Sequence, residues 1–356
     1  MLGYYKGSLI FTAICLALAA WLGWEITHAI GGTLGVLWIV AVLGVLEVSL
    51  SFDNAVVNAT VLRDMDPVWR KRFLSWGIII AVFGMRIVFP LLIVAVAAHL
   101  GPIEAIKLAA SDPVTYERLI TAAHVGISGF GGTFLAMVGL EFFLDKNKQV
   151  HWISLVERPF VRLAPVSGLA IGLVLMALYA ISRTIPVAEA MTFLTAGIFG
   201  LVAYILVQSI GALLGQDEDG HADGPAETGH GGGAAVVAAK SGLAGFLYLE
   251  VLDASFSLDG VIGAFALSNN LFVIALGLGI GAMFVRSMTV MLVDRGTLTE
   301  YRYLEHGAFY AILALAIIML VSVRFHIPET VTGLIGASLI GLAFLASVRS
   351  NKKHAG

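Results

Sequence analysis

Two short stretches, EVSLSFDNAV at residues 47–56 and DASFSLDGVI at residues 253–262, decide how this sequence folds. Each begins with an acidic residue, continues as S-x-S and ends near a second acidic residue six positions after the first. Both stand inside long apolar runs, where a charged side chain at a helix centre costs about 2.5–3.5 kcal/mol on membrane-insertion scales. The fold has to account for these carboxylates and for their occurrence in two copies.

The composition is that of a membrane protein. Of the 356 residues, 59% are hydrophobic and 13% are charged, and the mean hydropathy is +0.93, outside the range of soluble domains. The formal net charge of −3 shows no basic excess, which excludes a nucleic-acid-binding protein. Cys15 is the single cysteine, so intramolecular disulfides and cysteine-based zinc or iron–sulfur sites are also excluded.

The apolar runs predict an all-α, polytopic transmembrane bundle of about ten spans. About 20 apolar residues cross the hydrocarbon core. On that criterion the spans are expected at 8–27, 33–62, 73–99, 119–144, 166–182, 188–214, 241–267, 271–293, 305–323 and 329–348. Lys6 before the first run also fits a cleavable signal peptide, but the length of the run favours a retained helix.

Basic residues orient the bundle because they are retained on the cytoplasmic side. With the amino terminus inside, 15 of the 21 Lys and Arg residues fall on the cytoplasmic side and four outside. The remaining two, Arg86 and Arg286, fall within spans. We therefore expect a multi-pass protein of the cytoplasmic (inner) membrane with both termini in the cytoplasm.

The second half of the chain resembles the first in five segments that occur in the same order. For example, IFTAICLALAAW (10–21) resembles FLTAGIFGLVAY (193–204), and Gly77 and Arg86 are spaced like Gly277 and Arg286. This pattern predicts two five-helix units, over residues 1–187 and 188–356. Because five is an odd number of spans, the second unit would enter the membrane from the opposite side and have the inverted orientation. Inverted repeats of this kind are suited to alternating access.

The acidic stretch 215–240, rich in Gly and containing His, is expected to be a cytoplasmic linker between the units. A solvated spacer is the favoured interpretation, and capture of metal or contact with a stress-response protein is the alternative. A second copy of the same chain, forming a homo-oligomer, is the other partner considered.

The intramembrane carboxylates belong to Glu47, Asp53, Glu250, Asp253 and Asp259. Glu47 and Asp253 fall near the centres of their spans, and the second acid of each motif lies about 9 Å further along the helix. One stripe of the first helix holds Glu47, Ser51, Asn54 and Asn58, and the matching stripe of the second holds Glu250, Asp253, Ser257 and Gly260. Asp53 and Asp259 lie on other faces, so either the helices unwind near the motif or the stripes serve two sites.

Carboxylate, hydroxyl and amide oxygens without thiolates form a hard-ligand set suited to Mn²⁺, Ca²⁺ or Mg²⁺. The expected metal-binding residues are Glu47, Ser51, Asp53, Asn54, Asp253, Ser257 and Asp259. Glu250, Arg86, Arg286, His124 and His306 are expected to support them. The alternative is that the arginines neutralise the carboxylates as buried ion pairs. For the two histidines, hydrogen-bonded packing is the first interpretation, and a ligand or proton-relay role is the second.

The paired acidic motifs, the arginine one span later and GFGGTFLAMVGLEFF (129–143) resemble the TerC family of integral membrane proteins, associated with tellurium resistance and placed near the LysE exporters. The resemblance covers nearly the whole chain. It implies efflux of manganese or another divalent cation, with Glu47, Asp53, Asn54, Asp253 and Asp259 as ligands. Asp253 in place of Glu and Gly260 in place of a second Asn depart from the family pattern and leave the metal open.

The expected function is secondary active export of a divalent cation, Mn²⁺ favoured, coupled to proton exchange. The protein is not expected to be an enzyme or to hold a cofactor, and no nucleotide-binding P-loop occurs in the sequence. Two alternatives remain open: a non-transporting membrane scaffold of a metal or tellurite stress-response complex, and an exporter of a small organic solute.

Overall fold

The computed structural model of the chain describes residues 2–145, 148, 150–166, 168–218, 242–325 and 327–354, and no β-strand occurs among them. The expected all-α class is confirmed. The helices are α1 (Leu2–Thr27), α2 (Ile30–Leu50), α3 (Phe52–Asp64), α4 (Pro67–Ile79), η1 (Ile80–Val88), α5 (Phe89–Ala97), α6 (Pro102–Ser111), α7 (Pro113–Ala122), α8 (His124–Phe143), α9 (Ser154–Leu163), α10 (Leu169–Ser182), α11 (Val187–Glu218), α13 (Gly242–Ala264), α14 (Leu271–Asp294), α15 (Thr297–Glu300), α16 (Leu304–Ser322) and α17 (Glu329–His354).

Seven of the described helices are long and apolar enough to span a membrane: α1, α2, α8, α11, α14, α16 and α17. The pair Pro67–Gly77 and Ile80–Val96, bent by 45°, makes an eighth if it counts as one span. The chain is therefore a multi-pass membrane protein. The expected count of ten spans is not confirmed. α10 has only 14 residues, and α13 carries three acidic residues, Glu250, Asp253 and Asp259.

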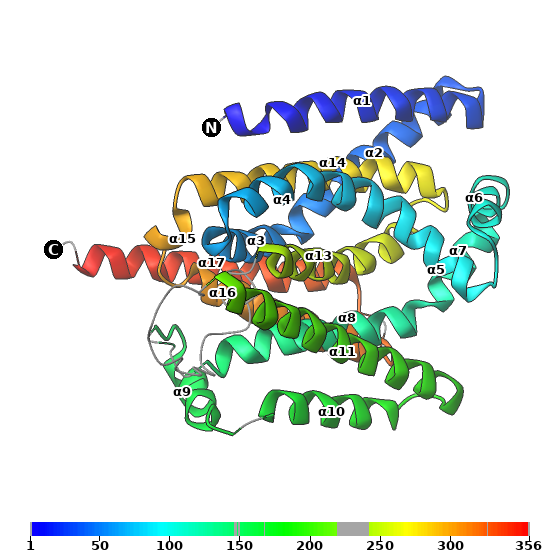
Figure 1. Cartoon of the computed structure of the whole chain (residues 1–356). Coiled ribbons are helices and arrows are strands. Elements are labelled where there is room, and N and C mark those ends of the chain that lie inside the picture. Colours follow the sequence, from blue (N-terminus) through cyan, green and yellow to red (C-terminus); the bar gives the residue numbers. More distant parts are fainter. Residues whose placement is uncertain are drawn as a thin grey trace.

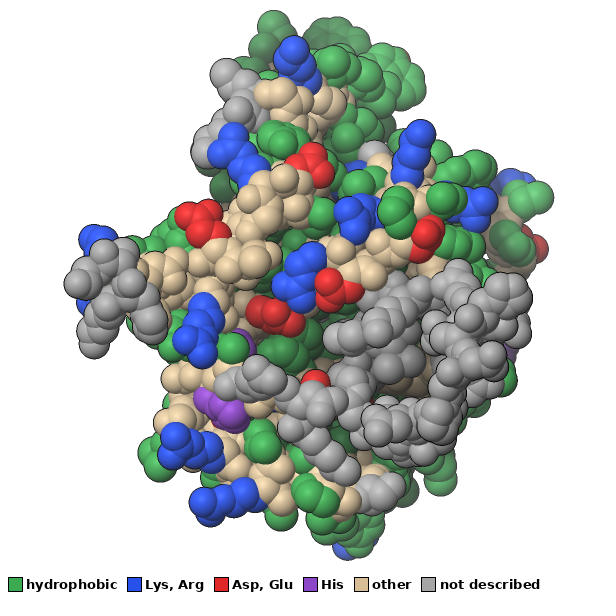
Figure 2. All heavy atoms as spheres, turned by 60° about the vertical axis from the view of Figure 1, so that its left-hand side comes forward, with side chains coloured by type: hydrophobic (Ala, Val, Ile, Leu, Met, Phe, Trp, Pro, Cys, Tyr) green, Lys and Arg blue, Asp and Glu red, His purple; other side chains and the backbone are tan. Residues whose placement is uncertain are grey.

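The helices run broadly side by side, and both chain termini lie at the same end of the bundle (Figure 1). α1 and α10 lie on opposite outer sides, while α8, α14 and α16 are the most buried of the apolar helices. The end with the termini carries Lys and Arg side chains spread over its surface (Figure 2). The predicted linker 215–240 begins within α11, and residues 219–240 lie outside the described part of the chain.

Small residues set the distance between α2 and α14. A Cβ on Gly277 would lie 2.5 Å from Leu43 Cβ, and a Cβ on Gly281 would overlap the Cβ of Glu47. These two glycines, four residues apart, let the helix backbones approach closely, as small-xxx-small pairs do in membrane bundles. The close crossing holds the side chain of Glu47 between the two helices.

We expect Gly281→Ala to lower the free energy of unfolding by about 1–3 kcal/mol, because the added methyl group overpacks this crossing. Gly279→Ala is the matched control, since its Cβ would meet Val82 Cγ1 at an ordinary 3.4 Å. Thermal unfolding of the purified protein in detergent measures both variants. Equal stability of the two variants would contradict the packing described here.

Candidate functional site

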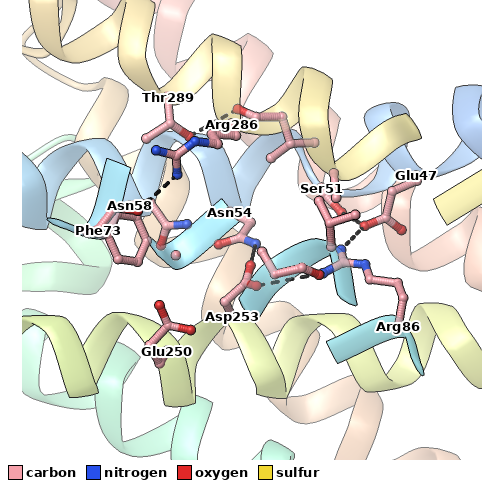
Figure 3. A pocket seen from close by; sticks show the side chains of 15 residues that line it. Glu47, Ser51, Asn54, Asn58, Phe73, Arg86, Glu250, Asp253, Arg286 and Thr289 are labelled. Carbon is pink, nitrogen blue, oxygen red and sulfur yellow. Dashed lines mark hydrogen bonds and ion pairs between the residues drawn. The ribbon is translucent and has the colours of Figure 1, made fainter. Parts of the chain in front are cut away.

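A small cavity lies where α2, α3, η1, α13 and α14 meet, and we call it the central cavity (Figure 3). Its volume is about 30 Å³. A cavity needs roughly 10–15 Å³ to hold one water molecule, so this one has room for one or two waters or for a monatomic ion. Its polar lining consists of Glu47, Ser51, Asn54, Asn58, Arg86, Glu250, Asp253, Arg286 and Thr289.

The chain breaks its helix at Ser51, between the two acids of the first motif. α2 ends at Leu50 and α3 begins at Phe52, while Ser51 has φ −100° and ψ 19°. The Ser51 hydroxyl donates to Glu47 Oε1 at 3.3 Å. Unwinding near S-x-S-x-D, one of the two predicted alternatives, thus occurs in the first motif. In the second motif α13 continues without a break through Ser257.

Arg86 reaches the central cavity from the π-helix η1, and Pro90 explains why a π-helix forms there. Proline lacks an N–H, and its ring clashes in an α-helix with the carbonyl four residues earlier, here that of Arg86. The backbone instead takes wider turns, in which the Phe89 N–H donates to the Gly84 carbonyl five residues back. Such π-segments frequently occur at functional sites.

The Arg86 guanidinium lies between two carboxylates on different helices (Figure 3). Its Nη2 donates to Glu47 Oε1 at 2.5 Å, and its Nη1 lies 3.7 Å from Asp253 Oδ2. Nη1 also donates to the Ala81 carbonyl at 2.6 Å. Arg86 is only 3% exposed, Glu47 4% and Asp253 8%. This is a desolvated ion-pair network that links α2, η1 and α13.

Arg286 makes no such pair with the described carboxylates. Its Nη1 donates to the Phe73 carbonyl at 3.2 Å, and its Nη2 is buried without a hydrogen-bond partner. Glu250 Oε1, on another wall of the same cavity, is likewise buried and unpartnered. Among the side chains described, Arg86 thus forms the ion pairs of the alternative interpretation, and Arg286 forms none.

Several buried oxygens of the central cavity receive no hydrogen bond from the described residues. These are Asn54 Oδ1, Asn58 Oδ1, Glu250 Oε1 and Asp253 Oδ2. The other oxygen of Asp253 accepts from Asn54 Nδ2 at 2.7 Å. The unpartnered donors of the same cavity, Arg86 Nε and Arg286 Nη2, are fewer than these oxygens. Because buried polar atoms in proteins are nearly always partnered, this excess of acceptors marks a place where a cation or water is needed.

The carboxylates of the central cavity outnumber its cations. Glu47, Glu250 and Asp253 face two guanidinium groups, Arg86 and Arg286, which leaves one formal negative charge unbalanced. Within the described residues, no group of three or more His, Cys, Asp or Glu side chains converges as a metal site. Any ion held here would therefore be coordinated by a mixture of carboxylate, amide and hydroxyl oxygens and water.

The structure separates the other expected ligands from the central cavity. Asp53 lines a second, separate cavity, together with Glu47 and Ser51. Ser257 is buried but lines neither cavity. The side chain of Asp259, also an expected ligand, lies outside the described part of the chain.

The two histidines lie away from both cavities. His124 Nε2 lies 3.2 Å from Ser128 Oγ and 3.4 Å from Ser322 Oγ. His306 Nε2 lies 2.7 Å from the Val150 carbonyl. Both histidines thus make their contacts away from the carboxylates of the two cavities, and His306 Nε2 also lies 3.7 Å from Glu157 Oε2.

The sequence analysis missed two polar features. Thr289 lines the central cavity one helical turn after Arg286, and this spacing is the signal that could have identified it. Glu157 on α9 is fully buried, accepts N–H bonds from Trp152 and Ile153, and lies 3.0 Å from Lys148 Nζ. Burial acts to raise the pKa of Glu157, but the Ile153 N–H and Lys148 outweigh it and hold the pKa below its usual value.

Residues 52–354 of the chain match the family described as "Protein of unknown function (DUF475)". The matched range begins just after the break at Ser51, so it includes Arg86 and Asp253 but not Glu47. No curated protein and no solved structure matches the chain.

We expect Arg86→Gln to lower the free energy of unfolding by about 3–5 kcal/mol, because it leaves Glu47 buried without a counter-charge. The double variant Glu47→Gln/Arg86→Gln should recover most of this loss. Arg286→Gln is the control and should cost less, since Arg286 forms no ion pair with the described carboxylates. Unfolding in mixed micelles measures all three, and equal losses for the two single arginine variants would contradict the assignment.

Proposed function

Since the chain belongs to the DUF475 family, whose description assigns no activity, we propose from the central cavity itself that this membrane protein transports a divalent metal cation. The observation that carries the proposal is the group of buried oxygens without donors beside an excess of carboxylates. Ionisable groups inside membrane spans are unfavourable and usually line an ion or substrate pathway. A bound cation would satisfy both the charge and the vacant acceptors.

The chemistry of the lining favours a small, hard ion. Carboxylate, amide and hydroxyl oxygens suit Mn²⁺, Ca²⁺ and Mg²⁺. The central cavity, at about 30 Å³, has no room for an organic solute in this conformation. We therefore prefer metal export over export of a small organic molecule. Mn²⁺ is the favoured substrate because the acidic motifs resemble those of the TerC family.

Arg86 has the position of an internal competitor for the cation. Its guanidinium pairs with Glu47 and approaches Asp253. An entering cation would displace it from at least one of these carboxylates, and its return would assist release. Protons on the same carboxylates would replace the cation during the return step, which makes proton exchange the natural coupling.

The proposed direction is export across the cytoplasmic (inner) membrane, with both termini in the cytoplasm. Both termini lie at the same end of the bundle, and Lys and Arg side chains are spread over that end, as expected for a cytoplasmic face. The TerC resemblance also favours efflux.

The proposal predicts that the full-length protein moves Mn²⁺ into proteoliposomes, tested beside Ca²⁺, Mg²⁺, Zn²⁺ and Co²⁺. Asp253→Asn should reduce the rate by about 10- to 100-fold, the usual effect of disturbing a metal's ligand environment. Asp112→Asn is the matched control. Asp112 is an exposed helix cap that accepts from the Thr115 N–H, and Asn caps equally well.

Two results would overturn the proposal. One is that none of the five ions moves, and the other is that Asp253→Asn transports like the parent protein. Normal function after loss of the carboxylates, combined with failure after deletion of residues 219–240, would instead indicate the scaffold role.

A further inference from the structure

The second cavity lies at the junction of α2 and α3, against α13, α16 and the start of α17. Its volume is about 40 Å³. Its polar lining groups belong to Glu47, Ser51, Asp53 and Thr332. Like the central cavity, it has room for a monatomic ion with a water molecule.

This cavity contains two buried carboxylates and no lining cation among the described residues. Glu47 is 4% exposed and Asp53 is 6% exposed. Asp53 Oδ1 accepts the backbone N–H of Asn54 at 2.9 Å, a contact that does not neutralise its charge. No Lys or Arg lines the second cavity, and since Glu47 already pairs with Arg86, Asp53 is the carboxylate that has no counter-charge among the described residues. A buried carboxylate without a counter-charge is strongly unfavourable.

Glycines keep space beside both carboxylates. A Cβ on Gly260 would lie 3.4 Å from Glu47 Oε2, and a Cβ on Gly336 would lie 3.3 Å from Asp53 Oδ2. A Cβ on Gly260 would be in ordinary contact with Glu47 Oε2, and a Cβ on Gly336 would be slightly too close to Asp53 Oδ2, so larger side chains at both positions would cover the oxygens with hydrocarbon. Gly260 is also the position at which the second motif departs from the Asn54 of the first.

The two cavities follow one another along α13. Glu250 and Asp253 line the central cavity, while Phe256 and Gly260 line the second, about 5–10 Å beyond Asp253 along the helix axis at 1.5 Å per residue. α13 runs away from the end that holds both termini (Figure 1). Glu47 and Ser51 line both cavities and therefore stand at the boundary between them.

We propose that the second cavity is a second subsite for a divalent cation, formed by Asp53, Glu47, Ser51 and Thr332. The inference rests on the proposed transport function and extends it. Glu47 is a ligand shared by two successive subsites. A cation can therefore pass from one subsite to the other while it stays coordinated by the Glu47 carboxylate. Asp53 lies on a different face of α3 from Asn54 and Asn58, and for this reason it lines the second cavity while they line the central cavity.

Equilibrium binding of Mn²⁺ to the purified full-length protein tests the proposal. The parent protein should bind two Mn²⁺ per chain. Asp53→Asn should bind one, and Asp253→Asn should retain one, because each variant removes a carboxylate from a single cavity. Asp112→Asn, on the exposed cap of α7, should bind two.

Thr332→Val provides a second variant in case Asp53→Asn does not fold. It removes a hydroxyl from the second cavity at nearly constant volume, and it should weaken one of the two binding steps by about 10-fold while leaving the other unchanged.

The outcomes separate the two proposals. One Mn²⁺ per chain, lost in Asp253→Asn and unaffected by Asp53→Asn and Thr332→Val, would overturn the second subsite and leave the transport function standing. Absence of any Mn²⁺ binding together with absence of flux would overturn the transport function itself.

Discussion

The Arg86 guanidinium between Glu47 and Asp253 is the interaction on which the rest of the site depends. It joins carboxylates from α2 and α13 inside a protein whose outer surface faces lipid, where an unpaired charge is unfavourable. Three local features make the contact possible. Pro90 widens the helix around Arg86, the break at Ser51 ends α2 just after Glu47, and Gly281 lets α14 approach Glu47 closely.

The predicted counterparts in the two halves of the chain do not have the same conformation. Arg86 lies on a π-helix, whereas Arg286 lies within the continuous helix α14. The sequence provides a reason, because Val290 stands four residues after Arg286 where Pro90 follows Arg86. The first motif breaks at Ser51, while α13 passes unbroken through the second. The two arginines of the central cavity therefore differ: Arg86 is engaged by carboxylates, whereas Arg286 Nη2 has no hydrogen-bond partner among the described residues.

Sequence alone predicts the helical membrane class and much of the central cavity, for reasons that lie in particular residues. The spacing of Glu47, Ser51, Asn54 and Asn58 places all four on one helical stripe, and all four line the central cavity despite the break at Ser51. The span count was less predictable, since α10 is short and α13 carries three acidic residues. The contact of Arg86 with Asp253 could not be predicted from the sequence either. Periodicity shows on which face of its helix a residue lies, but it does not show which other helix packs against that face. Periodicity does place Asp53 on another face from Asn54 and Asn58, but it cannot show which helices close the second cavity around it.

The central claim is that a metal cation replaces a guanidinium beside buried carboxylates. Anomalous scattering at the manganese edge, from crystals of the full-length protein grown with saturating Mn²⁺, tests it most directly. The account predicts a manganese peak beside Glu250 and Asp253, with Arg86 moved away from at least one of its two carboxylates. A central cavity that holds only water, with Arg86 still bridging Glu47 and Asp253, would contradict it.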